Sequence, residues 1–524
     1  MSPTAGHAPD PYEPYRVKEP LDTSRLPSPV LDAQPRMVEL YWKAWEIAWR
    51  HVLERDDTPQ RRYIDPGMNP ATTWVWDSCL MSMYCKYAPQ IFPGVETLNL
   101  FYYILHDRKP SAVKIHFADN PPLFAWVEWQ YYLMTGDVQR LQFLDEHGYL
   151  EKHFEFMERA AWTRPNPAVR VWPTAARHAM GYTWRGNTSG MDNTPRGRNA
   201  VNEKIFNPRG QIGINFIFWL DLLAQQALSA RFIAKIAAVL GHQDKVAKYE
   251  NVYKDLVDLL NKYYWDEKDG FYYDIMRRPA FWLRARHARG KNIMNKVPTI
   301  ASYWPMLAGA CDERKAAALA AKASDPAWFG TPVPWPSLAR RDPEFEPSGR
   351  YWRGGVWLPT AYMATKALEQ YGYHETADAN AERMVAAMVD TYHQVEPHTI
   401  WEVYSPTEAR PATHKRRVNK ETVRGEFCGW SALGPISLLI ENVIGFHSID
   451  APNRRISWRV HQPGRSGIKN LRFGSIITDL VHETGKIHVS TSAPFELCIT
   501  SPRADVLKRF EIQKGDQELS LKKE

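Results

Sequence analysis

The sequence predicts a mainly α-helical protein, an (α/α)6 toroid of about six helical hairpins followed by a small C-terminal β-domain. Amphipathic segments, with apolar residues three and four positions apart, follow one another from residue 37 to residue 443. They come in pairs joined by short turns, and longer loops rich in Gly, Pro, Asn and Trp separate the pairs. From residue 451 to residue 512 the pattern changes to short β-branched runs bounded by turn residues, which are typical of strands.

Three regions follow from these patterns. Residues 1–33 carry prolines at 3, 9, 11, 14, 20, 27 and 29, so we expect an N-terminal arm that is extended or disordered rather than helical. Residues 34–448 are assigned to the helical toroid. Residues 449–524 are assigned to the β-rich domain, which ends in the charged tail KGDQELSLKKE.

The helices can be placed in order along the chain. The segment MVELYWKAWEIAWRHVLER predicts the first one. Further helices are expected at 78–90, 94–107, 121–136, 138–163, 209–241 (as one helix or as a broken one), 243–263, 299–309, 313–323, 355–372, 374–393 and 429–443. Asp77 fits a helix start, and Gly241 and Gly372 fit helix stops. Within the helical region, the convincing strand-like alternation is confined to short pieces such as GFYYDIM.

Composition and hydropathy indicate the cellular location expected for the protein. The chain has 524 residues, of which 44% are hydrophobic and 24% charged, and its mean hydropathy is −0.48. We find no run of about 18 apolar residues, so no membrane span is expected. The first twenty residues contain no basic start followed by an apolar run, so no secretory signal is expected either. These observations favour a cytoplasmic location.

Metal, cofactor and nucleic-acid chemistry find little support in the sequence. The five cysteines are scattered without CxxC spacing, which indicates buried thiols rather than a disulfide framework or a zinc site. The chain contains no GxxxxGK[ST], HExxH or GxSxG motif, so we expect no cofactor and no metal. The net charge is only +7, and the one basic run, HKRRVNK at 414–420, is interpreted as a solvated loop rather than a nucleic-acid contact.

Tryptophan is the unusual component. The chain has 21 Trp beside 25 Tyr and 20 Phe, and several of the tryptophans stand in the long loops between helix pairs. In a toroid of antiparallel hairpins these loops open on one rim, so we expect them to converge on one funnel. A funnel lined by Trp, Tyr, Asp, Asn and Arg suits sugar rings, whose apolar faces lie on indole and whose hydroxyls bind carboxylates and guanidinium groups.

The stretch NTSGMDNTPRG holds one carboxylate, Asp192. Glycosidic cleavage needs one protonated and one ionised carboxyl group. Asp192 suits the acid, since desolvation beside Met191 and Gly190 would raise its pKa; the alternative is a turn aspartate that binds local amides. Glu402 suits the base, and the alternative for it is a salt-bridged surface glutamate. Glu426, in RGEFCGWSALG, is a rival base.

Two interpretations are given for each of three further residues. Asp77 could contact sugar hydroxyls or cap the following helix. Arg353 could bind a substrate hydroxyl or carboxylate, or form a structural ion pair. His116 is interpreted as a packed or capping histidine rather than a functional one.

Six motifs carry a family resemblance. WVWDS, NPPLFAWVEW, SGMDNTPR, YWRGGVW, WEVYSPT and FCGWSALGPI occur in this order over residues 65–445. The set resembles glycoside hydrolase family 63 and the mannosylglycerate hydrolase-like enzymes, and more distantly the trehalases of family 37. The resemblance implies an (α/α)6 toroid and the hydrolysis of α-glycosides with inversion. Residues 451–524 lie outside it.

The resemblance also implies roles for single residues. It implies that Asp192, in the SGxDN-type motif, is the general acid. It implies that Glu402, in E-x-Y-x-P, is the base. The late FGW or FSW motif of the family is written FCGW here, so Glu426 stays as the alternative base. The residues expected to line the sugar site are Trp76, Asp77, Asn120, Trp184, Arg196, Trp335, Trp352, Arg353, Trp357, Trp401 and Tyr404.

The hypothesis from the sequence is therefore an inverting α-glycosidase acting on a carbohydrate, with carboxyl groups roughly 6.5–9.5 Å apart. An α-glucoside or α-mannoside is expected, as a small oligosaccharide or a glycosylated small acid. A toroidal polysaccharide lyase, an inverting phosphorylase and a glycan-binding protein without activity are the alternatives. The chain is a possible homo-oligomer.

Overall fold

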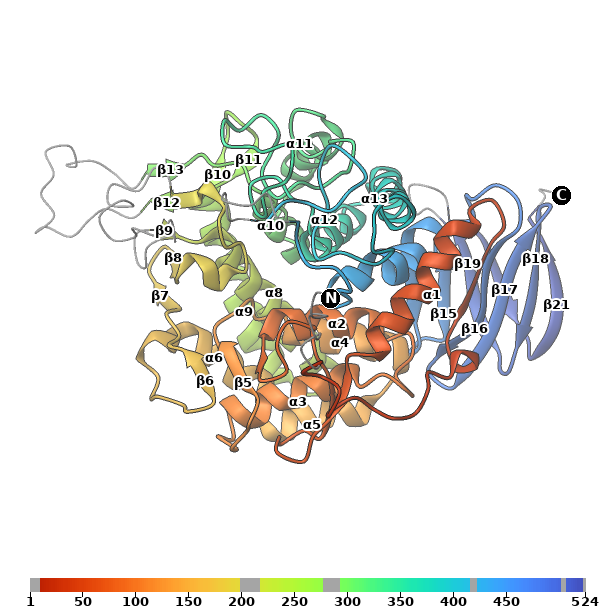
Figure 1. The fold of residues 1–524 in the computed structure, drawn as a ribbon, viewed down its shortest axis with the longest axis horizontal. Helices are drawn as coiled ribbons and strands as arrows, with labels where there is room; N and C mark the ends of the chain where they lie inside the picture. Colours follow the sequence, from red (N-terminus) through yellow and green to blue (C-terminus); the bar gives the residue numbers. More distant parts are fainter. Residues whose placement is uncertain (1–9, 198–216, 277–292, 415–421, 501–505, 522–524) are drawn as a thin grey trace, which may run out of the picture.

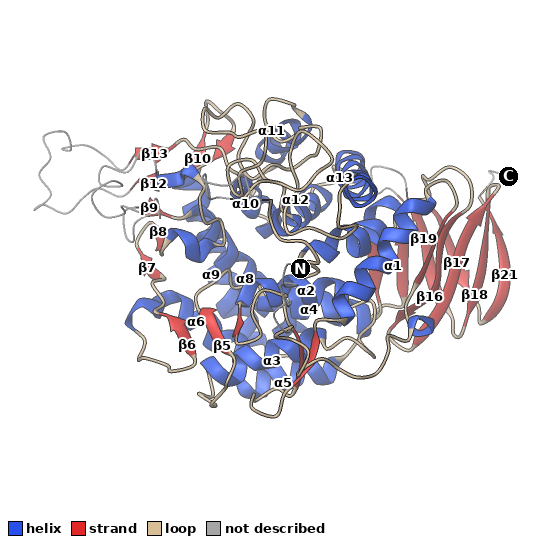
Figure 2. Ribbon diagram, in the orientation of Figure 1, coloured by secondary structure: helices blue, strands red, loops and turns tan. Residues whose placement is uncertain are grey.

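Helices and long strands occupy separate parts of the molecule. The computed structural model describes residues 10–197, 217–276, 293–414, 422–500 and 506–521 (Figure 1). Helices fill one part, and the long strands of the C-terminal region form the other (Figure 2). The protein is thus mainly helical with additional sheets. Residues 415–420 of the basic run and 209–216 of one predicted helix lie outside the described residues.

The helices follow the predicted order closely. The helices are α1 (Pro35–Trp49), α2 (Val75–Cys85), α3 (Gly94–Leu105), α4 (Phe124–Thr135), α5 (Val138–His147), α6 (Tyr149–Arg159), α8 (Leu220–Val239), α9 (Gln243–Leu259), α10 (Trp304–Ala308), α11 (Glu313–Ser324), α12 (Leu358–Gln370) and α13 (His374–Gln394). Short helical turns are η1 (Thr23–Arg25), η2 (Ala160–Trp162), η3 (Gly186–Ser189), η4 (Pro195–Gly197), η5 (Leu260–Tyr264), η6 (Ile300–Tyr303) and η7 (Ser431–Leu433), and the last helix is η8 (Gly434–Val443).

Five helices and the η7–η8 segment contact one another around a closed circuit. α2 packs on α4, α4 on α8, α8 on α10, α10 on α12, and α12 on η7 and η8, which return to α2. The other long helices lie on this circuit: α3 packs on α2, α9 on α8, and α13 on α12 and η8. Trp76 in the first turn of α2 lies 6.2 Å from Trp352 in the loop before α12, so these two segments meet.

The inner helices are buried because they are surrounded by other helices. α8 is long and apolar enough to cross a membrane, but 78% of its apolar window is buried inside the protein, which is the environment of a core helix. Every residue of α2 is buried. Gly241 and Gly372 follow helices with φ near +80°, so both predicted stop signals are confirmed.

Two helix predictions need correction. The predicted helix 138–163 is divided into α5 and α6, because Gly148 takes the left-handed conformation (φ 61°) and ends α5. Asp77 does not start α2: Trp74 is the N-cap, and Asp77 lies in the first turn. Its carboxyl group is therefore not used as a cap.

The C-terminal strands form two sheets. One has the order β1-β16-β17-β18-β21 and the other β14-β15-β19-β20. Their strands are β1 (Ser28–Leu31), β14 (Ser448–Asp450), β15 (Arg455–Trp458), β16 (Ser466–Phe473), β17 (Ile476–Glu483), β18 (Lys486–Thr491), β19 (Phe495–Thr500), β20 (Val506–Ile512) and β21 (Gly515–Ser520). Two features were not predicted: β1 comes from the N-terminal arm and pairs with β16, and β21 lies in the expected charged tail.

Short strands build the rim of the helical part. They are β2 (Val52–Glu54), β3 (Arg62–Ile64), β4 (Thr72–Thr73), β5 (Lys114–Phe117), β6 (Val169–Val171), β7 (Ala176–His178), β8 (Gly181–Thr183), β9 (Ile217–Phe218), β10 (Trp265–Asp266), β11 (Phe271–Tyr272), β12 (Asp274–Met276) and β13 (Ile293–Asn295). β4, β5 and β6 form one parallel sheet. This sheet joins the loop before α2 to the strand that carries His116.

Candidate active site

The loop that carries Asp192 is fixed on two sides. Gly190 takes a left-handed conformation (φ +82°) directly against the indole of Trp76, and a Cβ atom there would stand 2.4 Å from that ring, so only glycine fits. The side chain of Asn193 donates a hydrogen bond to the carbonyl oxygen of Arg350 (3.1 Å) and accepts one from the backbone N–H of Trp352 (2.8 Å). The SGMDN segment is thereby joined to the YWRGG segment.

Asp192 is half-buried, so its carboxyl group is less desolvated than expected. Its charge acts on two neighbours. Burial and the Arg170 charge lower the pKa of His116, and the Asp192 charge opposes this. Burial raises the pKa of Tyr351 well above its usual range, and the charges of Glu402 and Asp192 raise it further. Asp192 therefore lies close to both His116 and Tyr351.

Glu402 is buried and its carboxyl group has two donors. The Tyr351 hydroxyl donates to Oε1 (3.0 Å), and Nε of Arg424 donates to Oε2 (3.3 Å). The Glu402 side chain is only 2% exposed, while that of Arg424 is 43% exposed. Burial raises the pKa of Glu402 above its usual value, and the Arg424 charge and the Tyr351 hydrogen bond offset part of this rise.

An unusual backbone aims Tyr351 at Glu402. Arg350 and Tyr351 both have positive φ, 29° and 65°, which is uncommon for residues with side chains. The backbone N–H of Tyr351 donates to the carbonyl oxygen of Thr413 (2.9 Å). A Cβ atom at Gly355 would stand 2.2 Å from the Tyr351 carbonyl oxygen, so the second glycine of YWRGG is required for this turn.

Asp77 lies in the same cluster. It is 1% exposed, and neither carboxyl oxygen has a hydrogen-bond partner among the described residues. Burial raises the pKa of Asp77 well above its usual range, and the charges of Glu402 and Asp65 add to this. A buried carboxyl group without donors is costly, so these oxygens are suited to accept hydrogen bonds from ligand hydroxyl groups.

Four tryptophans form a packed floor beside these carboxyl groups, here called the tryptophan cluster (Trp76, Trp352, Trp357 and Trp430). Trp352 and Trp357 stack with ring centres 4.0 Å apart, and Trp76 lies 6.2 Å from Trp352. The indole N–H of Trp430 donates to the carbonyl oxygen of Glu402 (3.1 Å). Because the faces of Trp352 and Trp357 cover each other, these rings hold the site rather than offer two platforms to a sugar.

Three other predicted tryptophans are buried with unused donors. Trp184, Trp335 and Trp401 are between 0% and 5% exposed, and their indole N–H groups have no acceptor among the described residues. Trp74, in contrast, is half-buried and tilts against His116 with ring centres 5.4 Å apart. Trp74 and His116 thus form a more accessible wall near Asp192.

Asn120 and Tyr404 support the loops of the site. The Asn120 amide donates to the carbonyl oxygen of Thr188 (2.8 Å), which joins the HFADNPP loop to the Asp192 loop. Its own side-chain oxygen has no partner among the described residues. The Tyr404 hydroxyl accepts a hydrogen bond from the backbone N–H of Trp401 (3.1 Å), so Tyr404 positions the loop that carries Glu402.

Arg196 is not available to a substrate. Its side chain is fully buried and makes two bonds to Asp274 (2.6 Å each) and two to Asp221 (2.6 and 3.2 Å). It also lies over the ring of Trp219, 4.4 Å from its centre. The predicted binding role is therefore wrong, since the guanidinium group is used by two core carboxylates.

Arg353 and Glu426 also point elsewhere. Arg353 forms an ion pair with Glu344, which is the structural alternative considered for it. The Glu426 side chain is 65% exposed and pairs with Arg50 at 3.4 Å. An exposed carboxylate paired with an exposed arginine does not suit a catalytic base, so the structure favours Glu402 over Glu426.

Sequence reasoning missed Tyr351 and Arg424, the two residues that contact the Glu402 carboxyl group. Tyr351 begins the quoted motif YWRGGVW, and Arg424 precedes Glu426 by two residues. No local sequence pattern indicated either contact. The contact of Tyr351 depends on a left-handed turn, and the contact of Arg424 joins two residues that are 22 positions apart.

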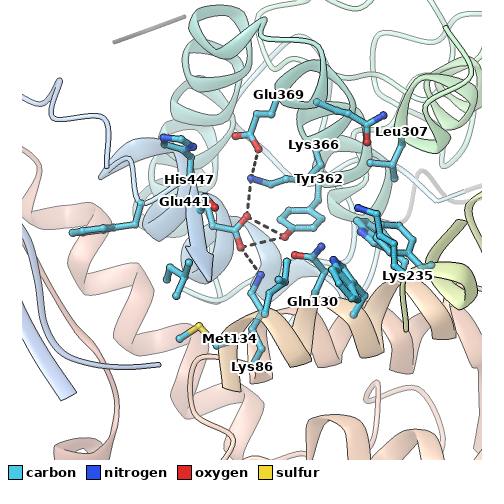
Figure 3. Close-up of a pocket in the computed structure, with 18 of the residues that line it drawn as sticks. Lys86, Gln130, Met134, Lys235, Leu307, Tyr362, Lys366, Glu369, Glu441 and His447 are labelled. Atoms are coloured by element: carbon cyan, nitrogen blue, oxygen red, sulfur yellow. Dashed lines mark hydrogen bonds and ion pairs between the residues drawn. The ribbon is translucent and has the colours of Figure 1, made fainter. Parts of the chain in front are cut away.

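A separate cavity of about 360 Å³ lies at the other end of the inner helices (Figure 3). Glu441 accepts hydrogen bonds there from Lys86 (3.0 Å), Tyr87 (2.6 Å) and Tyr362 (3.0 Å), and it pairs with Lys366 (2.7 Å). Lys86 follows the last turn of α2, whereas the unpaired Asp77 is in its first turn. This network joins α2, α12 and η8 at the base of the circuit.

Among the described residues, no three His, Cys, Asp or Glu side chains are grouped closely enough to hold a metal ion. The five cysteines are free thiols.

Sequence comparison identifies the family. A family model described as the mannosylglycerate hydrolase MGH1-like glycoside hydrolase domain matches residues 104–417, more than half of the chain. The chain belongs to this family. This MGH1-like protein is therefore a glycoside hydrolase, and both Asp192 and Glu402 fall inside the matched segment. The resemblance seen in the motifs is confirmed.

The sequences of named relatives align with limited parts of this MGH1-like hydrolase. It is 38% identical over 111 residues to mannosylglycerate hydrolase MGH1 of Selaginella moellendorffii, covering 21% of this chain and 20% of that protein. It is 24% identical over 287 residues to the mannosyl-oligosaccharide glucosidase of Saccharomyces cerevisiae, covering 52% of this chain and 31% of that protein. In both comparisons the chain spans less than a third of the relative's length.

Solved structures are similar in fold. The GH63 mannosylglycerate hydrolase from Thermus thermophilus, in complex with Tris, superposes on this MGH1-like chain with a TM-score of 0.55. The two are 18% identical, and the match covers 76% of this chain and 99% of that one. At this identity the likeness concerns the fold alone.

Proposed function

We propose that this glycoside hydrolase is an inverting α-glycosidase built on an (α/α)6 toroid, with Asp192 as general acid and Glu402 as general base. The closed circuit of helix contacts supports the toroid, and the two C-terminal sheets support a separate β-domain beside it. The observation that carries the catalytic assignment is that Asp192 and Glu402, 210 positions apart in the sequence, both act on the Tyr351 side chain.

The surroundings of the two carboxyl groups suit different roles. Donors from Tyr351 and Arg424 favour the ionised form of Glu402, which is the form that takes a proton from water. Asp192 stands in a half-buried position next to Trp74 and His116, where a leaving group can reach it. In this proposal Asp192 protonates the glycosidic oxygen while Glu402 activates water on the opposite face of the ring.

The substrate proposed is an α-mannoside or α-glucoside of a small acid or a short oligosaccharide. The names of the relatives, which are mannosylglycerate hydrolases and a mannosyl-oligosaccharide glucosidase, support this class. Asp77 supplies two unpaired oxygens for the hydroxyl groups of the sugar that is cleaved. The tryptophan cluster holds the floor below it.

A leaving group that needs no proton separates the two roles. We expect Asp192→Asn to hydrolyse an α-glycosyl fluoride at near wild-type rate, but to lose about 10²–10⁴-fold on the corresponding alkyl glycoside. Glu402→Gln should lose activity on both substrates, because both need an activated water. Equal losses of Asp192→Asn on the fluoride and the alkyl glycoside would contradict the acid assignment, and an active Glu402→Gln would contradict the base assignment.

A further inference from the structure

A second surface with carbohydrate-binding chemistry lies on the flank of the rim. It is a groove of about 400 Å³ between the end of α3, the loop after α6 and strand β6. Arg108, Arg164, Arg170 and Trp172 line it. We propose that this groove, here called the flank groove, binds an acidic oligosaccharide: a chain of sugar rings that carries carboxylate or sulfate groups.

Exposed tryptophan is the first observation. The described residues contain two strongly exposed tryptophans, Trp162 (68%) and Trp172 (47%), while nearly all others are buried or half-buried. Trp172 lines the groove, and Trp162 directly precedes the lining residue Thr163. Leaving an indole in water is unfavourable, and such exposed apolar groups mark binding surfaces. A flat ring open to solvent suits the apolar face of a pyranose.

Unbalanced positive charge is the second observation. No Asp or Glu lines the flank groove, and its three arginines form no ion pair with any described residue. Arg108 donates to the carbonyl oxygen of Pro165 (2.7 Å), and Arg170 donates to the hydroxyl of Thr72 (2.9 Å). Arg164 is exposed and makes no side-chain hydrogen bond to a described residue. Guanidinium groups without acidic partners suit carboxylate or sulfate oxygens.

The groove is distinct from the proposed catalytic site but adjoins it. β6 pairs with β5, which carries His116, and the Arg170 charge lowers the pKa of His116 after the larger effect of burial. Trp172 directly follows β6, and Arg164 precedes it in the loop after α6. A saccharide bound there would be held next to the funnel without filling it. The proposal therefore goes beyond hydrolysis and does not depend on which glycosidic bond is cleaved.

Binding to defined hexasaccharides tests the proposal. Calorimetry would use Asp192→Asn full-length protein, so that turnover cannot intervene, with hexagalacturonate (carboxylate), a heparin-derived hexasaccharide (sulfate and carboxylate) and maltohexaose (neutral). We expect both acidic chains to bind at least about tenfold more tightly than the neutral chain, with affinity that falls as salt is added. The difference between the two acidic chains tells carboxylate recognition from sulfate recognition.

Variants locate the binding. On the same background, Trp172→Ala and Arg164→Ala should each weaken acidic binding about tenfold, which is the loss of one stacking or charge-assisted contact. Trp172→Phe, which keeps a flat ring, should stay within about threefold of the parent. Arg340→Ala is the matched control, because Arg340 is also exposed and its side chain makes no hydrogen bond or ion pair with a described residue; it should bind like the parent.

Three results would overturn the proposal. The first is equal affinity for maltohexaose and hexagalacturonate. The second is unchanged acidic binding in both Trp172→Ala and Arg164→Ala, with both proteins folded by circular dichroism. The third is tighter binding of a hexameric single-stranded RNA than of either acidic saccharide, which would make this a nucleic-acid surface.

Catalysis should not depend on the flank groove. When Trp172→Ala and Arg164→Ala are made in the otherwise wild-type enzyme, the hydrolysis of a small neutral glycoside should be unchanged.

Discussion

The hydroxyl group of Tyr351 lies 3.0 Å from a carboxyl oxygen of Glu402 and donates a hydrogen bond to it. This bond favours the ionised form of Glu402, while burial acts in the opposite direction. In Tyr351→Phe the pKa of Glu402 should rise, so the acidic limb of the pH profile of kcat/KM should move to higher pH. We also expect kcat/KM at the optimum to fall about tenfold.

A tyrosine far from the site is the control for this change. Tyr253 binds backbone carbonyl oxygens of residues 308 and 309. Tyr253→Phe should leave both limbs of the profile in place. An unshifted acidic limb in Tyr351→Phe would mean that the hydroxyl does not tune Glu402.

Arg196 is predicted to stabilise the fold and not to bind the substrate. Arg196→Ala leaves the Asp221 and Asp274 carboxylates buried without their shared partner, which costs about 3–5 kcal/mol of unfolding free energy. Arg353→Ala removes only the half-buried pair with Glu344 and should cost at most about 1 kcal/mol. Urea denaturation measures both. A stable Arg196→Ala enzyme with a raised KM would restore the binding role.

We expect Asp77 to lower the stability of the folded protein and to promote substrate binding. Its folded-state pKa is raised by burial, so the wild-type protein loses stability as pH rises above the unfolded value of about 3.9. Asp77→Asn avoids this loss, and we expect the ligand-free variant to be about 1–3 kcal/mol more stable at pH 7. The gain should vanish near pH 4, and kcat/KM should fall about 100-fold because the amide offers the sugar one acceptor oxygen instead of two. A gain in melting temperature that does not depend on pH would contradict this explanation.

Glu441 should make the base of the helical circuit sensitive to acid. The charges and hydrogen bonds of Lys366, Lys86 and Tyr87 overcome the cost of burial and lower the pKa of Glu441 to about 2. Its stabilising effect is therefore present above the unfolded pKa of about 4.3 and is lost as pH falls from there toward 2. Glu441→Gln should cost about 3 kcal/mol at pH 7, and the difference from wild type should shrink below pH 4.

An exposed glutamate serves as the comparison for Glu441. Glu518 pairs with Lys486 on the surface, so Glu518→Gln should change stability little at any pH. Equal losses in the two variants, or a loss in Glu441→Gln that persists unchanged at pH 3, would show that the buried network does not act through charge.

Local sequence patterns located the helices and suggested the two carboxyl groups as candidates, but they did not indicate the contacts between distant segments. Helical periodicity repeats over many residues, whereas β4 has two residues and β6 has three, too few for alternation to be visible. Arg196 belongs to the same motif as Asp192, SGMDNTPR, and was expected in the site. Its partners Asp221 and Asp274 lie 25 and 78 residues away, so the buried triad had no local signal.

The choice between Glu402 and Glu426 shows the same limit. Glu402 directly follows Trp401 and Glu426 precedes an apolar segment, and both have an arginine nearby in space or sequence. Only the packed structure separates them, because Glu402 turns inward to Tyr351 while Glu426 remains on the surface. The position of the Tyr351 side chain itself depends on a left-handed backbone conformation, which sequence periodicity does not predict.

The stereochemistry of the released sugar tests the central proposal most directly. Proton NMR of an α-mannoside or α-glucoside hydrolysate, recorded within the first minutes before mutarotation, identifies the anomer that forms first. If water activated by Glu402 attacks opposite to the bond that Asp192 protonates, the β-anomer appears first and the α-anomer follows. First appearance of the α-anomer would mean a retaining mechanism and would contradict the roles proposed for these two residues.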